Sequence, residues 1–358
     1  MTGRALTGHD FMRVLVRTPN WLGDIVMALP VFAALRAHFA DDVLVAGVPR
    51  AFAPVLSAVP AIDEIVPLHR DGRRGWRGLD AEAGELRDGG FDLAVLLPNS
   101  FGAAWVARRA GIRERWGFAA QWRRGLLTRA VPRPRQRAPL HQVAYYLELV
   151  RGLEIDPADP APRLEAPPQM VARARGALDA AGSDRDRPLV GIAPGASYGY
   201  AKRWLPDRYG RLVARLSREL GASVVLLGSA HDRDAGHAIE SSLAALGPVQ
   251  SDAQLVNLIG RTDLSQLVGT LACCRAVISS DSGAMHLAAA LGVSVTAIFG
   301  PTDERLTSPV GSHAVLTAPV RCRPCFFRDC PIDHRCMTRI SEDRVFHAVA
   351  GQLAAGDA

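Results

Sequence analysis

The chain has 358 residues, of which 48% are hydrophobic and 22% are charged, a composition typical of globular proteins with ordered cores. This length predicts two domains, each large enough for its own hydrophobic core. No run of 18 apolar residues occurs, and Arg13 and Arg17 bracket only a short apolar stretch near the N-terminus. The sequence therefore predicts neither a membrane span nor a secretory signal, and we expect a cytoplasmic protein.

The net charge of +6 is unevenly distributed along the chain. Residues 101–140 contain ten arginines and a single acidic residue, Glu114. A basic concentration of this kind favours contact with a polyanionic substrate, an anionic membrane surface or a nucleic acid. A solvated arginine-rich face is the alternative interpretation. The ten residues are Arg108, Arg109, Arg113, Arg115, Arg123, Arg124, Arg129, Arg133, Arg135 and Arg137.

The first half of the chain alternates between strand and helix patterns. Residues 13–17 form a short apolar strand pattern, and a helix pattern runs from Asp24 to about Phe39. Short apolar runs separated by helical stretches are typical of a parallel sheet that is covered on both faces. Further strands are predicted at 43–46, 64–67 and 92–97.

A proline-rich segment then interrupts the alternation. Three prolines fall within residues 156–162 and two more at 167–168, and this composition predicts a linker. Beyond it, strands are predicted at 189–193, 223–227, 276–279 and 293–299, with helices near 207–220, 264–273 and 284–291.

This pattern predicts an α/β protein with two doubly wound, Rossmann-like domains that face each other across a cleft, where ligands of such folds bind. We place the N-terminal domain at residues 1–165 and the C-terminal domain at 166–340. A helix and tail at 341–358 are expected to pack back on the N-terminal domain. The chain contains neither a G-x-G-x-x-G after its first strand nor a G-x-x-x-x-G-K-[ST], which argues against a dinucleotide dehydrogenase and a P-loop NTPase.

Lys202 is the only lysine among 42 basic residues. It lies in a glycine-rich loop, residues 193–204, that follows a predicted strand. Lysine carries a compact point charge, whereas arginine carries a flat fork of donors, so a retained lysine suits a concentrated anion such as a diphosphate. The alternative is that drift in base composition left one lysine on a solvated loop.

The segment from Ser279 to Gly292 is the strongest local signal for a phosphate site. A strand ends at Ser280-Asp281-Ser282, and a helix of small residues begins near Gly283. Free N–H groups and the positive end of a helix attract phosphate, and His286 follows one turn later. The alternatives are that Asp281 or Ser282 only caps the helix and that His286 is a core histidine.

Asp24 and a group of four cysteines are further candidates for functional residues. Asp24 follows the first strand and is either a helix cap or a general base that faces the cleft. Four cysteines lie within 15 residues near the C-terminus, a spacing compatible with a metal site such as structural zinc or with a loop of reduced thiols. They are Cys322, Cys325, Cys330 and Cys336.

These motifs together resemble glycosyltransferase family 9, the ADP-heptose:lipopolysaccharide heptosyltransferases, and most of all its heptosyltransferase II group. The resemblance extends over nearly the whole chain. It rests on Trp21-Leu22-Gly23-Asp24, Leu97-Pro98-Asn99-Ser100-Phe101, Pro194-Gly195-Ala196, Ala201-Lys202-Arg203-Trp204, Gly228-Ser229-Ala230 with Asp232, and Asp281-Ser282-Gly283-Ala284-Met285-His286.

The resemblance implies a GT-B fold and inverting transfer of heptose from ADP-L-glycero-D-manno-heptose to the first heptose of the lipopolysaccharide inner core, without a required metal. It implies that Asp24 is the base and that Lys202 contacts the sugar nucleotide. The expected donor-binding residues are Ser197, Tyr198, Lys202, Asp232, Asp281, Ser282, Gly283 and His286. The expected acceptor-binding residues are Asn99, Ser100, Arg123 and Arg124.

The expected partners are ADP-heptose, the inner-core acceptor and the anionic inner face of the cytoplasmic membrane. Two other functions stay open at this point. Another GT-B sugar-nucleotide enzyme, such as a heptosyltransferase of the first type or an epimerase, would share the nucleotide site. A nucleic-acid-binding protein would explain the basic segment, but its sparse aromatic residues argue against that function.

Overall fold

The computed structural model describes residues 11–68, 75–135, 138–157, 159–247, 254–311 and 313–355. The chain forms two compact units. The N-terminal unit comprises Met1–Arg137 and Val143–Pro160, and the C-terminal unit comprises Ala138–Gln142 and Ala161–Ala358. The division after Pro160 falls within the proline-rich segment in which the sequence predicted a linker.

The N-terminal unit contains a parallel sheet with the strand order β3-β2-β1-β4-β5-β6. The four strands predicted for this half are confirmed, whereas β5 and β6 were not predicted. The strands are β1 (Arg13–Arg17), β2 (Val43–Pro49), β3 (Glu64–Leu68), β4 (Leu93–Leu96), β5 (Glu114–Ala119) and β6 (Arg129–Pro132). The helices are α1 (Leu22–Met27), α2 (Leu29–His38), α3 (Ala53–Leu56), α4 (Trp76–Arg87), α5 (Phe101–Arg109) and α6 (Gln142–Gly152).

The helix predicted from Asp24 to Phe39 is divided in two. α1 ends at Met27 and α2 begins at Leu29, with Ala28 between them as a shared cap. Pro30 occupies the first turn of α2. Because proline has no N–H to donate to the preceding turn, one continuous helix cannot pass through this position without losing a hydrogen bond.

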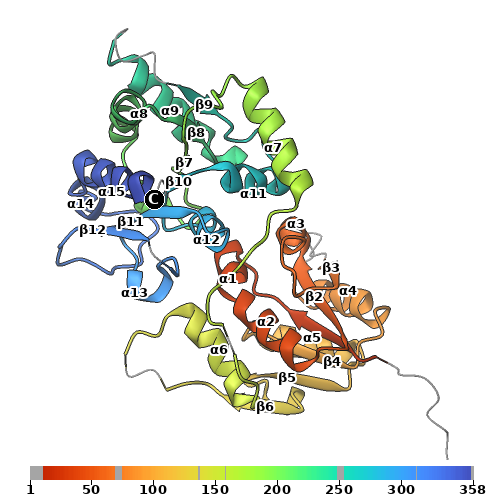
Figure 1. The fold of residues 1–358 in the computed structure, drawn as a ribbon. Helices are drawn as coiled ribbons and strands as arrows, with labels where there is room; N and C mark the ends of the chain where they lie inside the picture. The colour runs from red at the N-terminus through yellow and green to blue at the C-terminus, as the bar shows by residue number, and fades with distance from the viewer. Residues whose placement is uncertain are drawn as a thin grey trace, which may run out of the picture. The chain divides into compact units, whose positions relative to one another are not determined.

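The C-terminal unit repeats the same topology, with the strand order β12-β11-β10-β7-β8-β9 (Figure 1). The predicted α/β class of two doubly wound parallel sheets is thereby confirmed. The strands are β7 (Leu189–Ala193), β8 (Ser223–Leu226), β9 (Leu255–Asn257), β10 (Ala276–Ser280), β11 (Ser294–Phe299) and β12 (Ala314–Thr317). The main helices are α7 (Pro168–Ala180), α8 (Pro206–Leu220), α9 (Arg233–Ala244), α11 (Leu264–Cys273), α12 (Gly283–Ala290) and α15 (Glu342–Ala355).

One face of this second sheet is covered by α8 and α15 (Figure 1). Leu212 and Leu216 of α8 and Val345 and Val349 of α15 are all fully buried in one cluster with the inward residues of β7, β8 and β10. Burial of these apolar side chains is the main favourable contribution to the stability of this layer.

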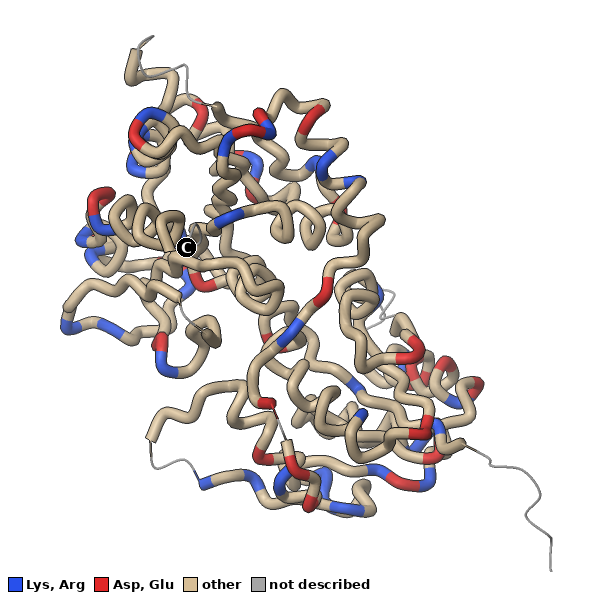
Figure 2. Tube along the Cα trace, in the orientation of Figure 1, with Lys and Arg blue, Asp and Glu red and all other residues tan. Residues whose placement is uncertain are grey.

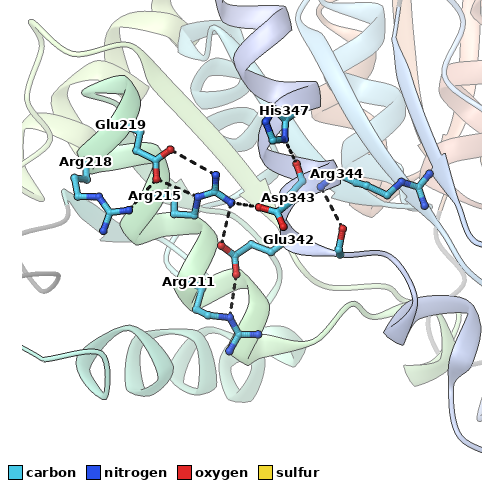
Figure 3. Close-up of polar contacts among 9 residues, drawn as sticks. Arg211, Arg215, Arg218, Glu219, Glu342, Asp343, Arg344 and His347 are labelled. Atoms are coloured by element: carbon cyan, nitrogen blue, oxygen red, sulfur yellow. Dashed lines mark hydrogen bonds and ion pairs between the residues drawn. The ribbon is translucent and has the colours of Figure 1, made fainter.

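The position of α15 corrects one expectation. The sequence placed the helix after residue 340 on the N-terminal domain, but α15 packs against α8, β10, β11 and β12 of the C-terminal unit. Its apolar face completes the core of that unit. Figure 3 shows that ion pairs flank this packing: Arg211 and Arg215 of α8 meet Glu342 of α15, and Arg215 also reaches Asp343.

The topology determines where polar loops gather. In each sheet the first strand of the unit is central, with β1 between β2 and β4 and β7 between β8 and β10. On one side of this strand the chain adds the second and third strands, and on the other side it adds the last three. The order of addition therefore reverses between β1 and β4 and between β7 and β10. The loops that leave the carboxyl ends of these two strands diverge, and ligands of doubly wound folds bind in the space between them. The loops after β1, β4, β7 and β10 are therefore the places to look for a site.

We predict that the apolar contacts between α8 and α15, and not the ion pairs, supply most of their stability. Leu212→Ala should lower the free energy of unfolding by about 2–5 kcal/mol, because it leaves a cavity in the core. The neighbouring Arg211→Gln removes exposed ion pairs to Asp207 and Glu342 and should cost less than about 1 kcal/mol. Thermal and urea unfolding of both variants test this, and similar losses in the two would contradict it.

Candidate functional site

A buried ion pair lies where the loops after β7 and β10 meet. The ammonium group of Lys202 donates to Oδ2 of Asp281 at 2.5 Å, and the hydroxyl of Thr302 donates to the same oxygen at 2.8 Å. Lys202 and Asp281 are 9% and 7% exposed. The alternative interpretation, in which Lys202 lies on a solvated loop, is wrong, because the side chain is buried and the Asp281 carboxylate compensates its charge.

The glycine-rich loop around Lys202 is held by aromatic contacts. The ammonium group lies 4.8 Å from the ring centre of Tyr198, and the Tyr198 hydroxyl donates to the carbonyl of Phe326 at 2.7 Å. A ring face attracts a cation, so Tyr198 helps to fix the lysine. Ser197, the other predicted residue of this loop, is exposed.

The helix α12 begins directly after Asp281. Ser282 is its N-cap residue and Gly283 its first residue. The Ser282 hydroxyl lies 3.0 Å from that of Ser279 and makes no capping bond to the helix. The N–H groups of the first turn and the positive helix end lie beside the Lys202–Asp281 pair, an arrangement that suits an anion.

His286 lies one turn into α12 and is 5% exposed. Burial lowers the pKa of its imidazole to about 4, a shift that His141 and Lys202 reinforce and Asp281 opposes. The ring is therefore neutral at physiological pH, and it can donate a hydrogen bond but brings no positive charge to the site.

Asp232 is committed to local structure. Its Oδ2 accepts from the N–H and the hydroxyl of Ser229 at 3.0 and 2.8 Å, and its Oδ1 accepts from Arg203 at 3.1 Å. A Cβ at Gly195 would overlap this carboxyl group. Asp232 thus ties the turn after β8 to the loop after β7, and Arg203 in turn lies over the Tyr200 ring.

In the N-terminal unit, the loops after β1 and β4 carry the other predicted residues. Asp24 is the third residue of α1, whose N-cap is Trp21, so the cap interpretation of Asp24 is wrong. Asn99 donates to the Tyr145 hydroxyl at 2.7 Å. Ser100 caps α5 by accepting from the N–H of Ala103 at 3.3 Å.

Arg123, one of the expected acceptor-binding residues, does not lie on the surface. Its side chain is fully buried and donates to the carbonyls of Phe118, at 2.9 Å, and of Pro98. Burial lowers the pKa of its guanidinium group to about 10. Arg123 therefore supports the loop that carries Asn99 and Ser100, whereas the adjacent Arg124 is exposed.

Other arginines of the basic segment form ion pairs with acidic residues. Arg129 pairs with Glu154 at 2.8 Å and Arg109 with Asp80 at 3.4 Å. Figure 2 shows basic and acidic positions side by side along β5, β6 and α6. The charge of the segment is thus partly compensated in the fold, and Arg137 lies outside the described residues.

The four cysteines do not form the predicted metal site. Cys322 and Cys330 are exposed, whereas Cys336 is buried in the apolar cluster beneath α15. Among the residues that the structure describes, no three or more His, Cys, Asp or Glu side chains form a group that could hold a metal ion. The prediction of zinc is therefore not supported.

Sequence reasoning missed Thr302 and Arg323. Arg323 donates to the carbonyls of Gly300 and Thr302 at 2.6 and 3.0 Å, next to the Thr302 hydroxyl that binds Asp281. No local motif around either residue indicates this contact, since it joins segments about 20 residues apart. The position of Thr302 just after β11, at the same edge of the sheet as Asp281, was the only usable signal.

Comparison with known proteins shows the family to which the chain belongs. The family model described as glycosyltransferase family 9 (heptosyltransferase) matches residues 82–335. Lipopolysaccharide heptosyltransferase 2 of Escherichia coli K12 is 34% identical over 308 residues, which cover 85% of this chain and 87% of that protein. Its counterpart in Salmonella typhimurium is 35% identical with the same coverage. The chain belongs to glycosyltransferase family 9, as its motifs indicated.

Solved structures agree with this assignment. The structure of E. coli ADP-heptose lipopolysaccharide heptosyltransferase II is 30% identical, with a TM-score of 0.80 over 97% of this chain and 100% of that one. E. coli heptosyltransferase WaaC with ADP is 18% identical, with a TM-score of 0.72 over 95% and 100% of the two chains, and shows the shared fold. Within the described residues, no helix is long and apolar enough to cross a membrane.

The buried imidazole makes a pH-dependent prediction. An unfolded histidine titrates near 6.5, whereas burial lowers the pKa of His286 to about 4. Between these values the unfolded chain binds the additional proton, so the free energy of unfolding falls on acidification, by up to roughly 3 kcal/mol. Urea unfolding of the wild type between pH 7 and 4.5 measures this dependence.

The variant His286→Gln should show a shallower loss of stability over the same pH range, because it has no imidazole to titrate. His347→Gln is the matched control, since His347 is exposed on α15 and should keep the wild-type slope. An unchanged slope in His286→Gln would contradict the prediction.

Proposed function

We propose that this chain is an inverting glycosyltransferase that moves heptose from ADP-L-glycero-D-manno-heptose to the first heptose of the lipopolysaccharide inner core. The observation that carries the proposal is the buried Lys202–Asp281 pair beside the start of α12. The names of the relatives with 34–35% identity support heptose transfer in lipopolysaccharide, and the 30% identical structure is that of an ADP-heptose lipopolysaccharide heptosyltransferase. The direct test is heptose transfer from ADP-heptose to a truncated inner core that ends at its first heptose.

In this proposal the C-terminal unit binds the donor. The diphosphate contacts Lys202, the N–H groups at Ser282 and Gly283, and the neutral imidazole of His286, while Ser197 and Tyr198 line the same loop. Asp281 contacts the sugar, and Asp232 acts through Arg203, which it holds in place.

Cleavage of the bond between the sugar and the β-phosphate oxygen leaves a second negative charge on the β-phosphate of ADP, and preorganised donors that face this charge lower the barrier. A lysine buried beside a helix N-terminus is such a donor, because it is oriented before the substrate arrives. We propose that this cation and the N–H groups stabilise the leaving group, so that no metal is required.

The N-terminal unit binds the acceptor in this proposal. Asp24 removes the proton from the attacking hydroxyl, and Asn99, Ser100 and the exposed Arg124 contact the phosphorylated inner core. Arg123 contributes by holding the carbonyl of Pro98, next to Asn99. Because the acceptor is anchored in a membrane, we place the enzyme in the cytoplasm, in peripheral contact with the anionic inner face through exposed arginines.

We predict that Asp24→Asn lowers kcat by about 100-fold or more, because the amide cannot accept the proton. Affinity for ADP, measured by calorimetry, should stay within twofold, since Asp24 belongs to the other unit. Asp41→Asn, an exposed carboxylate in the same unit, is the control and should keep wild-type kcat. If Asp24→Asn keeps its turnover per folded molecule, the base is another residue.

Lys202 is predicted to act in both folding and transfer, and a double variant separates the two roles. Lys202→Met leaves the Asp281 carboxylate buried without its cation and should cost about 3–5 kcal/mol of stability. Adding Asp281→Asn removes that charge and should restore the melting temperature. The kcat/KM of the double variant should stay at least about 30-fold below that of Asp281→Asn alone, the effect of losing a preorganised donor. Recovery of activity together with stability would show that Lys202 is only structural.

A further inference from the structure

The chain between β12 and α14 (Arg335–Thr338) contacts two loops at the carboxyl edge of the second sheet. We call residues 323–334 of this chain the bridging segment. On one side it holds the loop after β11: the N–H groups of Cys325 and Phe326 both donate to the carbonyl of Pro301, at 2.9 and 3.0 Å. Arg323 adds its bonds to the carbonyls of Gly300 and Thr302.

On the other side, the bridging segment holds the loop that carries Lys202. The N–H of Ala201 donates to the carbonyl of Arg328 at 2.8 Å, and Nε2 of His334 lies 2.7 Å from the carbonyl of Ala201. The Arg328 guanidinium group lies 5.3 Å from the ring centre of Tyr198. A Cβ at Gly199 would overlap the backbone of Arg328, so glycine is needed for this close approach.

These two loops supply the partners of one carboxylate oxygen. Oδ2 of Asp281 accepts from Lys202 of one loop and from Thr302 of the other. The geometry around that oxygen depends on how both loops are held, and the bridging segment contacts each of them through main-chain hydrogen bonds. Except for Arg323, Cys325 and His334, residues 323–334 are exposed, so hydrogen bonds and not apolar burial fix this connection.

Resting on the function proposed above, we propose that Arg323 and Thr302 are positioning residues for donor binding. Arg323 fixes the Gly300–Thr302 peptide, and its guanidinium group is itself oriented by Glu304, because Nη2 donates to Oε2 of that residue at 2.6 Å. Thr302 then occupies part of the hydrogen-bonding capacity of Asp281. With this donor in place, Asp281 is shared between Thr302 and Lys202, and the ammonium group is held where the diphosphate can contact it.

The pair Thr302→Val and Thr302→Ser tests this proposal with little change in shape. Valine removes the hydroxyl and keeps the volume, whereas serine keeps the hydroxyl. Thr302→Val should raise KM for ADP-heptose, and Kd for ADP, by about tenfold, the usual effect of losing a hydrogen bond to a charged group. KM for the acceptor should not change, and Thr302→Ser should recover most of the donor affinity.

Arg323→Gln should give the same selective loss of donor affinity. Combined with Thr302→Val it should cost little more than either change alone, because both act through one contact. The matched control is Arg335→Gln, which lies just beyond the bridging segment, pairs with Asp333 and should keep wild-type KM values. Melting temperatures of all variants show how much of each effect comes from unfolding.

Four outcomes would overturn the proposal: unchanged donor affinity in Thr302→Val, equal changes in both KM values, no recovery with serine, or additive losses in the double variant. The failure of the proposed function is a separate result. A wild-type protein that transfers no heptose and binds no ADP would refute that function, and this inference with it. A wild type that does both, with unaffected variants, would refute only the positioning roles of Arg323 and Thr302.

Discussion

The ion pair between Lys202 and Asp281 is the interaction on which the proposed donor site depends. Each partner follows one of the two adjacent strands β7 and β10, and each is almost fully buried. A buried charge is costly unless a partner and further hydrogen bonds compensate it. The contacts of Thr302 and of the Tyr198 ring therefore have a stabilising role that the surrounding apolar core cannot supply. The same contacts hold a cation in place beside a helix N-terminus, where a phosphate is favoured.

The repeated topology explains why both units present polar loops at equivalent positions. Both sheets follow one strand order, and in both the loops after the first and fourth strands of the unit carry the predicted residues. In the C-terminal unit these loops bring together a cation, a carboxylate and free helix N–H groups. In the N-terminal unit they carry Asp24 in the first turn of α1 and Asn99 next to the cap of α5. In the proposed function, the C-terminal set suits a negatively charged sugar-nucleotide donor. The N-terminal set suits the hydroxyl group of an acceptor.

Much of the fold and part of the site could be predicted from the sequence, for a physical reason. Buried parallel strands are short apolar runs, so eight of them were visible, and Lys202 and Asp281 were found because polar residues follow such runs. The edge strands β6, β9 and β12 and the internal strand β5 were missed, because each is short or only partly buried. Contacts between distant segments leave no local pattern, so neither the pairing of Lys202 with Asp281 nor the burial of Arg123 could be derived. The position of α15 could not be derived either, because the sequence does not show which apolar face of the fold this helix covers.

Arg123 and Lys202 are two of the cations that the described part of the chain buries, and the nature of their partners separates their roles. Arg123 is compensated by backbone carbonyls, which are neutral dipoles fixed in the fold, and desolvation lowers its pKa to about 10. Its partners cannot move without displacing the loop that carries Asn99, so Arg123 stabilises structure. Lys202 is compensated by the side chain of Asp281, a carboxylate with the same charge sign as a diphosphate. In the proposed donor site, a phosphate joins that carboxylate at the ammonium group without displacing a backbone carbonyl, and this difference separates the proposed ligand-binding role of Lys202 from the structural role of Arg123.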